Sequence, residues 1–581
     1  MRKTLLSTLA VAMWLGAALV CPAQETPKTL VTVAFSGYDS LAADIDYIAK
    51  LIGNPVLTKQ WEEMKKAVQE MGQGGIDSAK PWGAVVQIKN AAALMPGPDD
   101  FALLAFVPVK DFAKLKETLA GMKVEVKDAG DGVVEVATRR PLYLKEQGGW
   151  VFVGMSPDAL KDTPADPLAL LGELPRRHHL AARVSVKNIP SFYRKIFVTQ
   201  MQIGAQAALQ RQPNESDDEY AIRLNVTKQM LQQIATLVNE LDELLLGWGV
   251  DRTKGTTFFD FEMTAVAGTK TAGDFAQLAQ AKTNFAGFNL PGAALSGNFV
   301  GTFSDSDVAQ MKSAFSALKD KAIKDLKDEG LDGEELKLAT QVIGDLFGVM
   351  QKTIENKKAD MGVVLLLNPG AAAFVAGGLI ADGDKLEKVL KQVAEVMAKE
   401  DPDMAKMMKL DADKHQGVRF HTFTMPTPDP DAVKVIGQNL EVIVGISDQS
   451  LYVALGGDTA KTLKQVIDQS KANPDKAVSP LQVSVSVTPI LKVASAVAPD
   501  GPEKLIVGMI TAALEQSGGK DHISLSTKGI PNGAATRLEV EEGILKALMM
   551  TALMRTGAKA PPGVPGAAPG FPGGALPPET P

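Results

Sequence analysis

Apolar and polar residues follow a strand–helix pattern that is clearest just after residue 100. An apolar run at residues 101–107 ends at Pro108, and Asp111 opens a segment whose apolar residues recur every three or four positions. This spacing predicts a strand followed by an amphipathic helix that folds back to bury its apolar side. The same order returns at residues 373–390, so the chain contains a repeat.

The repeat extends along much of the chain. Leu115 aligns with Leu386 at an offset of 271 residues, and residues 151–153 align with residues 451–453 at an offset of 300. A repeat this long is typical of a duplicated domain, whereas the units of a solenoid have about 20–50 residues. We therefore predict an α+β fold with two duplicated halves, each a mainly antiparallel sheet covered by helices on one face.

Five segments are expected from these boundaries. They are a signal peptide at 1–23, a first α+β half at 24–270, a strand plus helical connector at 271–358, a second α+β half at 359–557, and a disordered tail at 558–581. The tail is rich in Pro and Gly and cannot bury enough apolar surface to offset the entropy of ordering.

Alternation inside the strands predicts that one face of each sheet is wet. Val184 and Val186 flank Ser185, so the two valines share one face and the serine lies on the other. The segment that starts at Val31 also resembles the one that starts at Val483. This likeness indicates that a shorter strand–helix unit underlies both halves.

One apolar segment, residues 361–381, is long enough to imitate a membrane-spanning helix. Within it, only Asn368 and Pro369 are clearly unsuited to lipid. These two residues and Gly370 form a typical turn sequence, and the matching part of the first half carries charged residues. We therefore predict a hairpin of two buried strands at this position.

The N-terminus has the pattern of a secretory signal. Arg2 and Lys3 precede an apolar run at residues 5–20, and small residues follow, which predicts cleavage before Gln24 and export to the periplasm or the extracellular space. A lipid anchor on Cys21 is the less favoured alternative, because the residue before it is branched. Cys21 is the only cysteine, so the mature chain has no disulfide framework and no cysteine metal site.

The charge balance argues against nucleic acid as a partner. The chain has 61 Lys and Arg against 68 Asp and Glu, a net charge of −7. Phosphate binding needs a basic face. The one basic cluster, Arg176, Arg177, His178 and His179 with Arg183 nearby, is interpreted as a solvated turn, because no aromatic residue interleaves with it.

Catalytic motifs are missing or incomplete. There is no GxSxG, HExxH or Walker A sequence. Ser316 and Lys319 match the SxxK motif, but the companion motifs are absent, so we interpret the match as coincidence. Residues 325–336 resemble a calcium loop, but Lys327 occupies a ligand position and Leu336 replaces the bidentate Glu.

The histidines and paired carboxylates give no convincing metal site. Asp411, Asp413 and His415 could line one strand face as weak ligands, but a solvated loop is the favoured interpretation. The pairs Asp401/Asp403 and Asp429/Asp431 flank prolines, which is a turn signature. The remaining histidines and the two methionine groups are at 178, 179, 421 and 522, and at 404, 407, 408, 549, 550 and 554. The sequence assigns no catalytic, cofactor-binding or metal-binding residue and no cofactor.

This layout resembles an uncharacterised family of exported bacterial proteins with tandem strand–helix repeats. The resemblance rests on YDSLAADIDYIAKLIGNP at 38–55, PWGAVVQ at 81–87 and FVPVKDF at 106–112. It implies export and an α+β architecture, and no active site.

These observations lead to one expected function and two alternatives. The expected function is a non-enzymatic, exported binding or scaffold protein of the cell envelope, whose partner is a protein or an apolar ligand. After signal cleavage we expect no membrane span. The first alternative is a periplasmic carrier of apolar ligands or lipids. The second is a hydrolase with a dispersed active site, because catalytic triads are recognised by geometry and not by sequence order.

Overall fold

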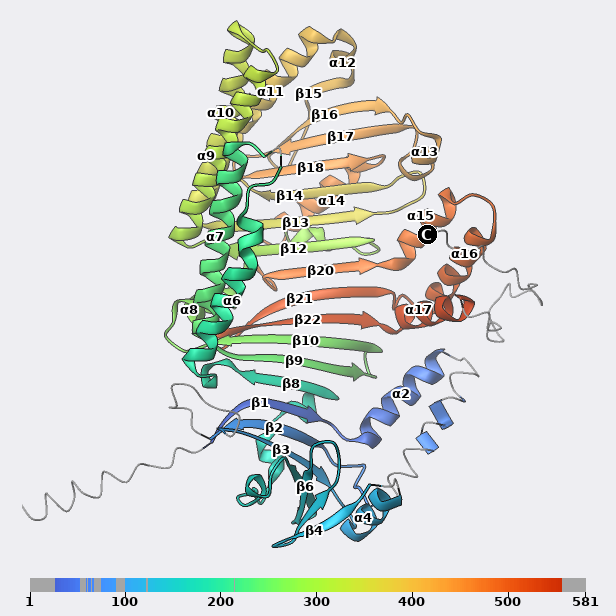
Figure 1. Ribbon diagram of the computed structural model, residues 1–581. Coiled ribbons are helices and arrows are strands. Elements are labelled where there is room, and N and C mark those ends of the chain that lie inside the picture. Colours follow the sequence, from blue (N-terminus) through green and yellow to red (C-terminus); the bar gives the residue numbers. More distant parts are fainter. Residues whose placement is uncertain are drawn as a thin grey trace, which may run out of the picture. The chain divides into compact units, whose positions relative to one another are not determined.

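A computed structural model (Figure 1) describes residues 27–52, 59, 61–63, 65–66, 75–89, 100–121, 124–213 and 215–555. The expected signal peptide and tail lie outside the described residues. The chain divides into two compact units, which do not follow the boundaries expected at residues 270 and 358. Unit 1 comprises Met1–Leu41, Lys66–Gln202 and Leu241–Leu245, and unit 2 comprises Ala42–Lys65, Ile203–Glu240 and Leu246–Pro581. The α+β class is confirmed.

Unit 1 contains an antiparallel sheet. Its described strands are paired in the order β4-β5-β6-β7-β3-β2-β1-β8. Their bounds are β1 Lys28–Phe35, β2 Trp82–Ile88, β3 Phe101–Pro108, β4 Val126–Gly130, β5 Val133–Val136, β6 Leu142–Gln147, β7 Trp150–Gly154 and β8 Leu180–Ser185. The helix predicted after Asp111 is α4 (Phe112–Gly121).

Short helical segments cover one face of the unit 1 sheet. They are η2 (Pro157–Leu160), η3 (Pro167–Leu170) and α5 (Leu174–Arg177). Leu160, Leu171 and Leu174 pack against Phe106 and Phe152 of the strands in one buried cluster. On the other face α4 packs near the β5–β7 end through Phe112, Leu115 and Leu119.

Unit 2 also contains an antiparallel sheet. Its described strands are paired in the order β15-β16-β17-β18-β14-β13-β12-β20-β21-β22-β10, with β9 beside β10. Their bounds are β9 Leu241–Asp251 (of which Leu246–Asp251 is in unit 2), β10 Thr256–Ala265, β12 Leu295–Thr302, β13 Lys358–Leu366, β14 Ala373–Leu379, β15 Met408–His415, β16 Val418–Pro426, β17 Asn439–Ile446, β18 Ser450–Gly456, β20 Leu481–Ser486, β21 His522–Ile530 and β22 Gly533–Glu541. A small separate pair joins β11 (Lys282–Thr283) to β19 (Lys476–Ala477).

Most helices of unit 2 lie between its strands in the chain. They are α7 Asp217–Glu240, α8 Lys270–Leu278, α9 Asp305–Asp328, α10 Gly333–Glu355, α11 Gly383–Glu400, α12 Pro402–Met407, α13 Pro430–Ile436, α14 Thr459–Lys471, α15 Val487–Val497, α16 Pro502–Glu515 and α17 Glu542–Arg555. Two helices, α2 (Tyr38–Ile52) and α6 (Ser191–Leu209), cross the division between the units. In the part of the chain that the structure describes, no helix is long and apolar enough to cross a membrane.

The hairpin predicted at residues 361–381 is confirmed. Residues 361–381 form most of the β13–β14 hairpin, with Val363 opposite Ala376. The side chain of Ser304 caps α9 by accepting from the Asp307 N–H, while the Asp307 carboxylate accepts from the Ser304 N–H. This capping box satisfies helix N–H groups that would otherwise lack partners.

The segment 271–358, expected as a strand plus helical connector, contains β12 and the helices α9 and α10. Its strand is β12, which pairs with β13 on one side and β20 on the other, so it lies inside the sheet of unit 2. The order β4-β5-β6-β7-β3-β2-β1-β8 in unit 1 and the order β15-β16-β17-β18-β14-β13-β12-β20 in unit 2 are the same connectivity when β1 is matched with β12.

Candidate ligand-binding surface

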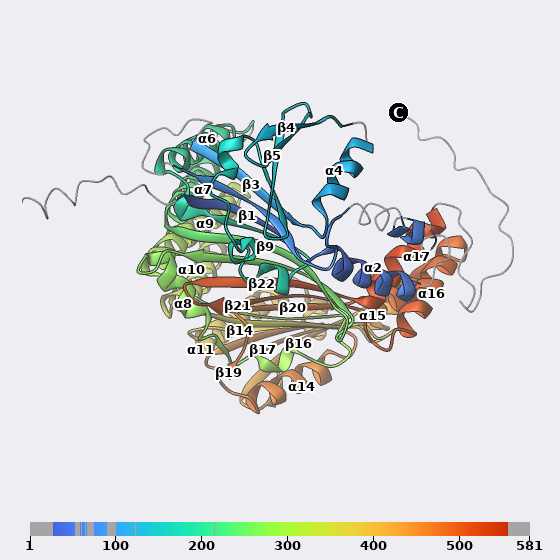
Figure 2. The ribbon, with the colours of Figure 1, turned by 90° about the horizontal axis from the view of Figure 1, so that it is seen from below.

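One face of the unit 2 sheet carries a closed core. The helix α14 and the short 3-10 turn η5 (Ala286–Phe288) pack against this face. Leu463, Val466 and Ile467 of α14 are buried against strand residues such as Val375 and Phe420. Figure 2 shows α14 on this side of the strands.

The opposite face of the same sheet presents apolar side chains in register. Directly opposed residues of antiparallel strands point to the same face, so the pairing defines rows that cross the sheet. The central row is Phe259, Leu538, Leu525, Val483, Gly297, Val363, Ala376, Val453, Val444 and His421.

Two further rows run beside the central row. The first is Phe261, Thr536, Thr527, Leu481, Phe299, Met361, Gly378, Leu451, Ile446 and Arg419. The second is Thr257, Val540, Ile523, Val485, Leu295, Leu365, Phe374, Leu455, Val442 and Phe423. We call the three rows together the apolar floor. Its polar members are three threonines near the β10 end and Arg419 and His421 on β16.

Large side chains of the apolar floor remain open to solvent. Phe259 is 50% exposed, Met361 is 49% exposed and Leu455 is 42% exposed. Phe261, Phe299, Leu538 and Val453 are also exposed. Scattered exposed apolar residues are ordinary, but a contiguous exposed apolar patch marks a binding surface in most soluble proteins.

The polar side chains of β12 and β20 point to the covered face of the sheet, whereas the alternation predicts that they face solvent. On β12 and β20, Ser296 lies opposite Ser484, and both point to the face that carries the closed core. Asn298 points the same way and donates to the Phe285 carbonyl. The apolar residues between them face the uncovered side. The prediction that alternation gives a wet face is therefore wrong for these strands, because Ser296 and Asn298 hydrogen-bond on the core side.

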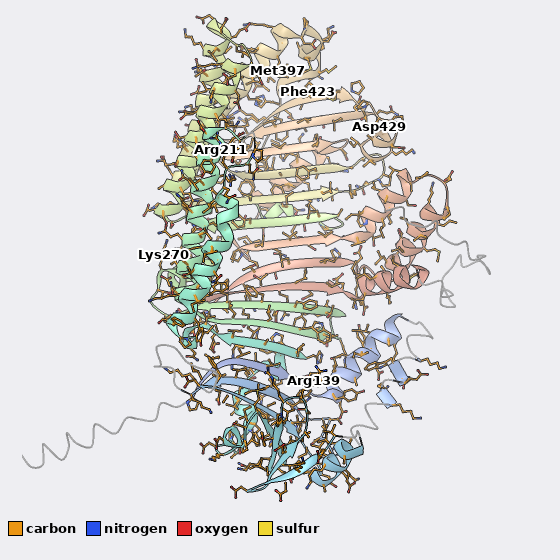
Figure 3. All side chains as sticks on the ribbon, in the orientation of Figure 1. Arg139, Arg211, Lys270, Met397, Phe423 and Asp429 are labelled. Carbon is orange, nitrogen blue, oxygen red and sulfur yellow. The ribbon has the colours of Figure 1, made fainter. Side chains whose placement is uncertain are left out.

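Two groups of helices lie at the two ends of the strands, on the side of the apolar floor. The group α9, α10 and α11 lies at one end, and the group α15, α16 and α17 at the other (Figure 1). Glu387 of α11 contacts Arg419 of the floor. At the other end, Leu514 and Ile544 pack with Ile523 and Val540 of the floor. Figure 3 shows strand side chains between the two groups, with Phe423 of β16 and Met397 of α11 labelled.

Charged residues form the boundary of the apolar floor at β16. Arg419 donates through Nε to Glu387 at 2.5 Å and through Nη2 to Asp384 at 2.9 Å. Lys391 Nζ lies 2.8 Å from a Glu387 oxygen and 2.8 Å from Asp411 Oδ2. Hydrogen bonding from Lys391 holds the pKa of Asp411 below its usual range. The two cations therefore bind the carboxylates that surround them.

His421 is the most buried member of this cluster. It is 4% exposed, and its Nδ1 accepts from the Asp411 backbone N–H at 3.2 Å. Because Nδ1 is an acceptor, the proton of the neutral ring is on Nε2, which lies 3.5 Å from Glu387 Oε1. Burial lowers the pKa of His421 below its usual range, so the ring is neutral at pH 7.

The Glu387, Asp411 and His421 ligand atoms lie within 4.8 Å of one another, a spacing that could suit a metal ion. Two features oppose metal binding. Lys391 already places a positive charge between the two carboxylates. In addition, a metal-binding His donates through its other ring nitrogen, whereas Nδ1 of His421 accepts. The cluster is better described as a network of ion pairs.

The grouping of Asp411, Asp413 and His415 on one strand face, which is the less favoured interpretation of the sequence, does not form. The register of β15 shifts between Lys409 and Asp413, and Asp411 has a φ of 50°. Asp411 therefore faces Lys391, while Asp413 and His415 contact Lys464 and Asp468 of α14. A β-bulge of this kind redirects side chains in a way that simple alternation cannot predict.

A second polar cluster lies at the start of β21. Asp521 accepts from the Ser486 hydroxyl at 2.7 Å and from the Thr488 N–H at 2.8 Å. His522 Nδ1 lies 3.2 Å from Asp521 and 3.1 Å from Glu541. Burial by itself would raise the pKa of Asp521, but the hydrogen bonds hold it below its usual range. Ser486 donates to a carboxylate and not to a histidine, which differs from the hydroxyl–histidine pair of a serine nucleophile.

The other candidate residues are structural. Ser316 and Lys319 lie inside α9, and Lys319 pairs with Asp320. The apparent calcium loop spans the end of α9 and the start of α10. The carboxylates of Asp401 and Asp429 cap α12 and α13.

The basic cluster is only partly solvated. Arg176 is exposed beside Glu173, as expected for a turn. His178 and His179 are buried, and His179 Nδ1 lies 2.9 Å from the Ser36 hydroxyl. The solvated-turn interpretation is therefore wrong for the two histidines.

Considered by itself, unit 1 has the same arrangement. Ala34, Val85 and Phe106 face the closed core. The alternate positions, which include Val33, Trp82, Leu103 and Leu180, are apolar and exposed.

Neither a protein-family model, nor a curated protein, nor a solved structure matches the chain. The resemblance to a family of exported repeat proteins therefore stays a prediction.

Proposed function

We propose that this chain is an exported, non-enzymatic protein of the cell envelope that binds the acyl chains of a lipid along the apolar floor. The observation that carries the proposal is the row-by-row exposure of apolar side chains on a sheet whose other face is already closed. The N-terminal pattern of residues 1–23 supports export.

The chemistry of the floor favours acyl chains over an extended polypeptide. The strands between β10 and β16 are paired on both sides, so their backbone groups are already satisfied. A polypeptide strand lying across them would leave its own N–H and C=O groups without partners, which costs free energy. A hydrocarbon chain has no such groups and gains about 25 cal/mol for each Å² of apolar surface that is buried.

The extent of the floor suits a long apolar ligand. The central row joins ten strand positions, and neighbouring strands are about 4.8 Å apart, which gives a row of about 43 Å. The row ends at the charged cluster around Arg419, so the apolar surface is bounded at β16. The charged groups of this cluster bind one another, which supports a binding role over catalysis.

The test is a lipid-binding measurement on the mature protein. Organic extracts of the purified protein are examined by mass spectrometry, and binding of a fluorescent long-chain fatty acid is titrated. The variant Met361→Asp places a charge on the floor and should weaken binding at least tenfold. The variant Leu318→Asp, at a residue of α9 that is 46% exposed, is the matched control. Absence of both co-extracted lipid and probe binding in the unaltered protein would refute the proposal.

A further inference from the structure

The three helices α15, α16 and α17 contain long uncharged segments. Residues 505–514 of α16 and residues 547–554 of α17 have no charged side chain, and α15 has only Lys492. A helix that is apolar around its circumference is normally buried on all sides. These three helices are not: within the described residues of the group, the closed cluster contains Leu514, Ile544 and Ala547.

Apolar side chains of the same helices are open to solvent. Leu505 is 62% exposed and Leu548 is 60% exposed, and Ile490 and Ile506 are exposed as well. We call these four residues the helix patch. Its helices pack on Ile523 and Val540 of the apolar floor through the cluster around Leu514. The helices that carry the helix patch therefore also pack against the surface proposed to hold acyl chains.

We propose that the helix patch is a membrane-contact surface, where the protein rests on a lipid bilayer and exchanges the ligand of the floor. This inference rests on the proposed function. It concerns contact with the bilayer surface and not a membrane span.

Charge and composition favour a bilayer over a protein partner. Residues 487–515 and 542–555 carry four basic and four acidic side chains, so the region is neutral although the chain has a net charge of −7. Protein interfaces depend on aromatic and Arg anchors. Phe, Tyr and Trp are absent from these two sequence segments. Aliphatic side chains with a few lysines suit insertion into the interfacial region of a membrane.

The experiment compares vesicle binding by the full mature protein and two double variants. Vesicles of phosphatidylcholine alone, and with added phosphatidylglycerol, are floated through a density gradient with the protein. Leu505→Ser/Ile506→Ser should lower the bound fraction at least tenfold. Leu318→Ser/Leu346→Ser, at exposed leucines of α9 and α10, should change it less than twofold. Leu548→Ser provides a second, independent change in the helix patch, and circular dichroism checks that each variant folds.

The outcomes separate this inference from the proposed function. Mass spectrometry should find the same co-extracted lipid in Leu505→Ser/Ile506→Ser as in the unaltered protein. If lipid is present but the protein does not bind vesicles, or binds them equally with and without the helix-patch residues, the inference is refuted and the function stands. A concentration-dependent dimer that the patch variants dissolve would also refute it, in favour of contact between two copies of the chain.

Discussion

At the scale of single residues, two glycines allow the closed core of unit 2 to form. A Cβ atom at Gly362 would lie 2.3 Å from the Phe288 ring, and one at Gly377 would lie 2.6 Å from the Tyr452 ring. The Phe288 and Tyr452 rings are stacked, with centroids 6.5 Å apart and an interplanar angle of 8°. Strand glycines of this kind make room for aromatic rings from the covering layer.

We expect Gly377→Ala to lower the free energy of unfolding by about 1–3 kcal/mol, because the added methyl group forces the two buried rings from their positions. Gly344→Ala is the control. Gly344 lies inside α10 with open space around its Cβ position, so this change should raise stability by about 0.5–1 kcal/mol. Urea denaturation measures both values. Equal effects of the two changes would show that the rings do not restrict Gly377.

Sequence could not distinguish these two glycines. Gly362 and Gly377 lie in apolar segments that correctly predicted the β13–β14 hairpin. Their role depends on Phe288, which is at least 74 residues away in the chain and reaches them only through the fold. Local spacing predicts an element, whereas the partner of a side chain depends on the tertiary arrangement.

At the scale of elements, the contact between α11 and β16 combines charge with burial. Glu387 and Lys391 of α11 and Arg419 of β16 surround the neutral ring of His421, with Asp411 on the neighbouring strand. The pKa of His421 is lowered in the folded state, so the folded protein binds a proton at this ring less readily than the unfolded chain does. The contribution of His421 to the free energy of unfolding is therefore fully present above the unfolded pKa of about 6.5, and it is lost as the pH falls.

The free energy of unfolding should therefore fall as the pH decreases from 7 to 5, with part of the decrease caused by His421. The variant His421→Phe keeps an aromatic ring and cannot titrate, so its stability should change less over the same interval. Urea denaturation at several pH values measures the difference. The variant His415→Phe, at a histidine on the α14 side, is the control. Identical pH dependence in His421→Phe and the unaltered protein would contradict this assignment.

The sequence predicted the main strands and helices better than it predicted the faces of the sheet. The apolar alternation of Val483 and Val485 is clear, but it does not show which face the helices cover. The covering elements, η5 and α14, come from positions far apart in the chain. The pattern does not reveal the bulge in β15 either, so simple alternation would place Asp411 and His415 on one face.

At the scale of the whole molecule, the strand connectivity repeats. Each run begins with a strand that pairs with the second and eighth strands of the run, as β1 pairs with β2 and β8, and β12 with β13 and β20. A duplicated unit would give this match, and the duplication stays a prediction. The expected second half begins at residue 359, after β12, because the long helices α9 and α10 separate β12 from β13 in the chain.

The strands β10 and β22 pair directly within unit 2. Asp260 and Arg537 occupy the middle of this pairing, which extends from Thr256 and Glu541 to Thr264 and Gly533. Arg537 donates to Asp260 through Nε at 2.7 Å and through Nη2 at 2.8 Å. Its guanidinium carbon also lies 4.0 Å from the centre of the Phe258 ring. The pair therefore stabilises the contact between β10 and β22.

We expect Arg537→Met to lower the free energy of unfolding by about 1–3 kcal/mol, because it leaves the buried Asp260 carboxylate without this cation. The loss of one partner from a fully buried pair costs about 3–5 kcal/mol, and the smaller value follows from the 38% exposure of the Arg537 side chain. Denaturation followed by tryptophan fluorescence measures the loss. The double variant Asp260→Leu/Arg537→Met should recover most of it, since an apolar pair can replace an ion pair of similar volume. If the double variant is less stable than Arg537→Met alone, the carboxylate itself, and not its loss of a partner, holds β10 and β22 together.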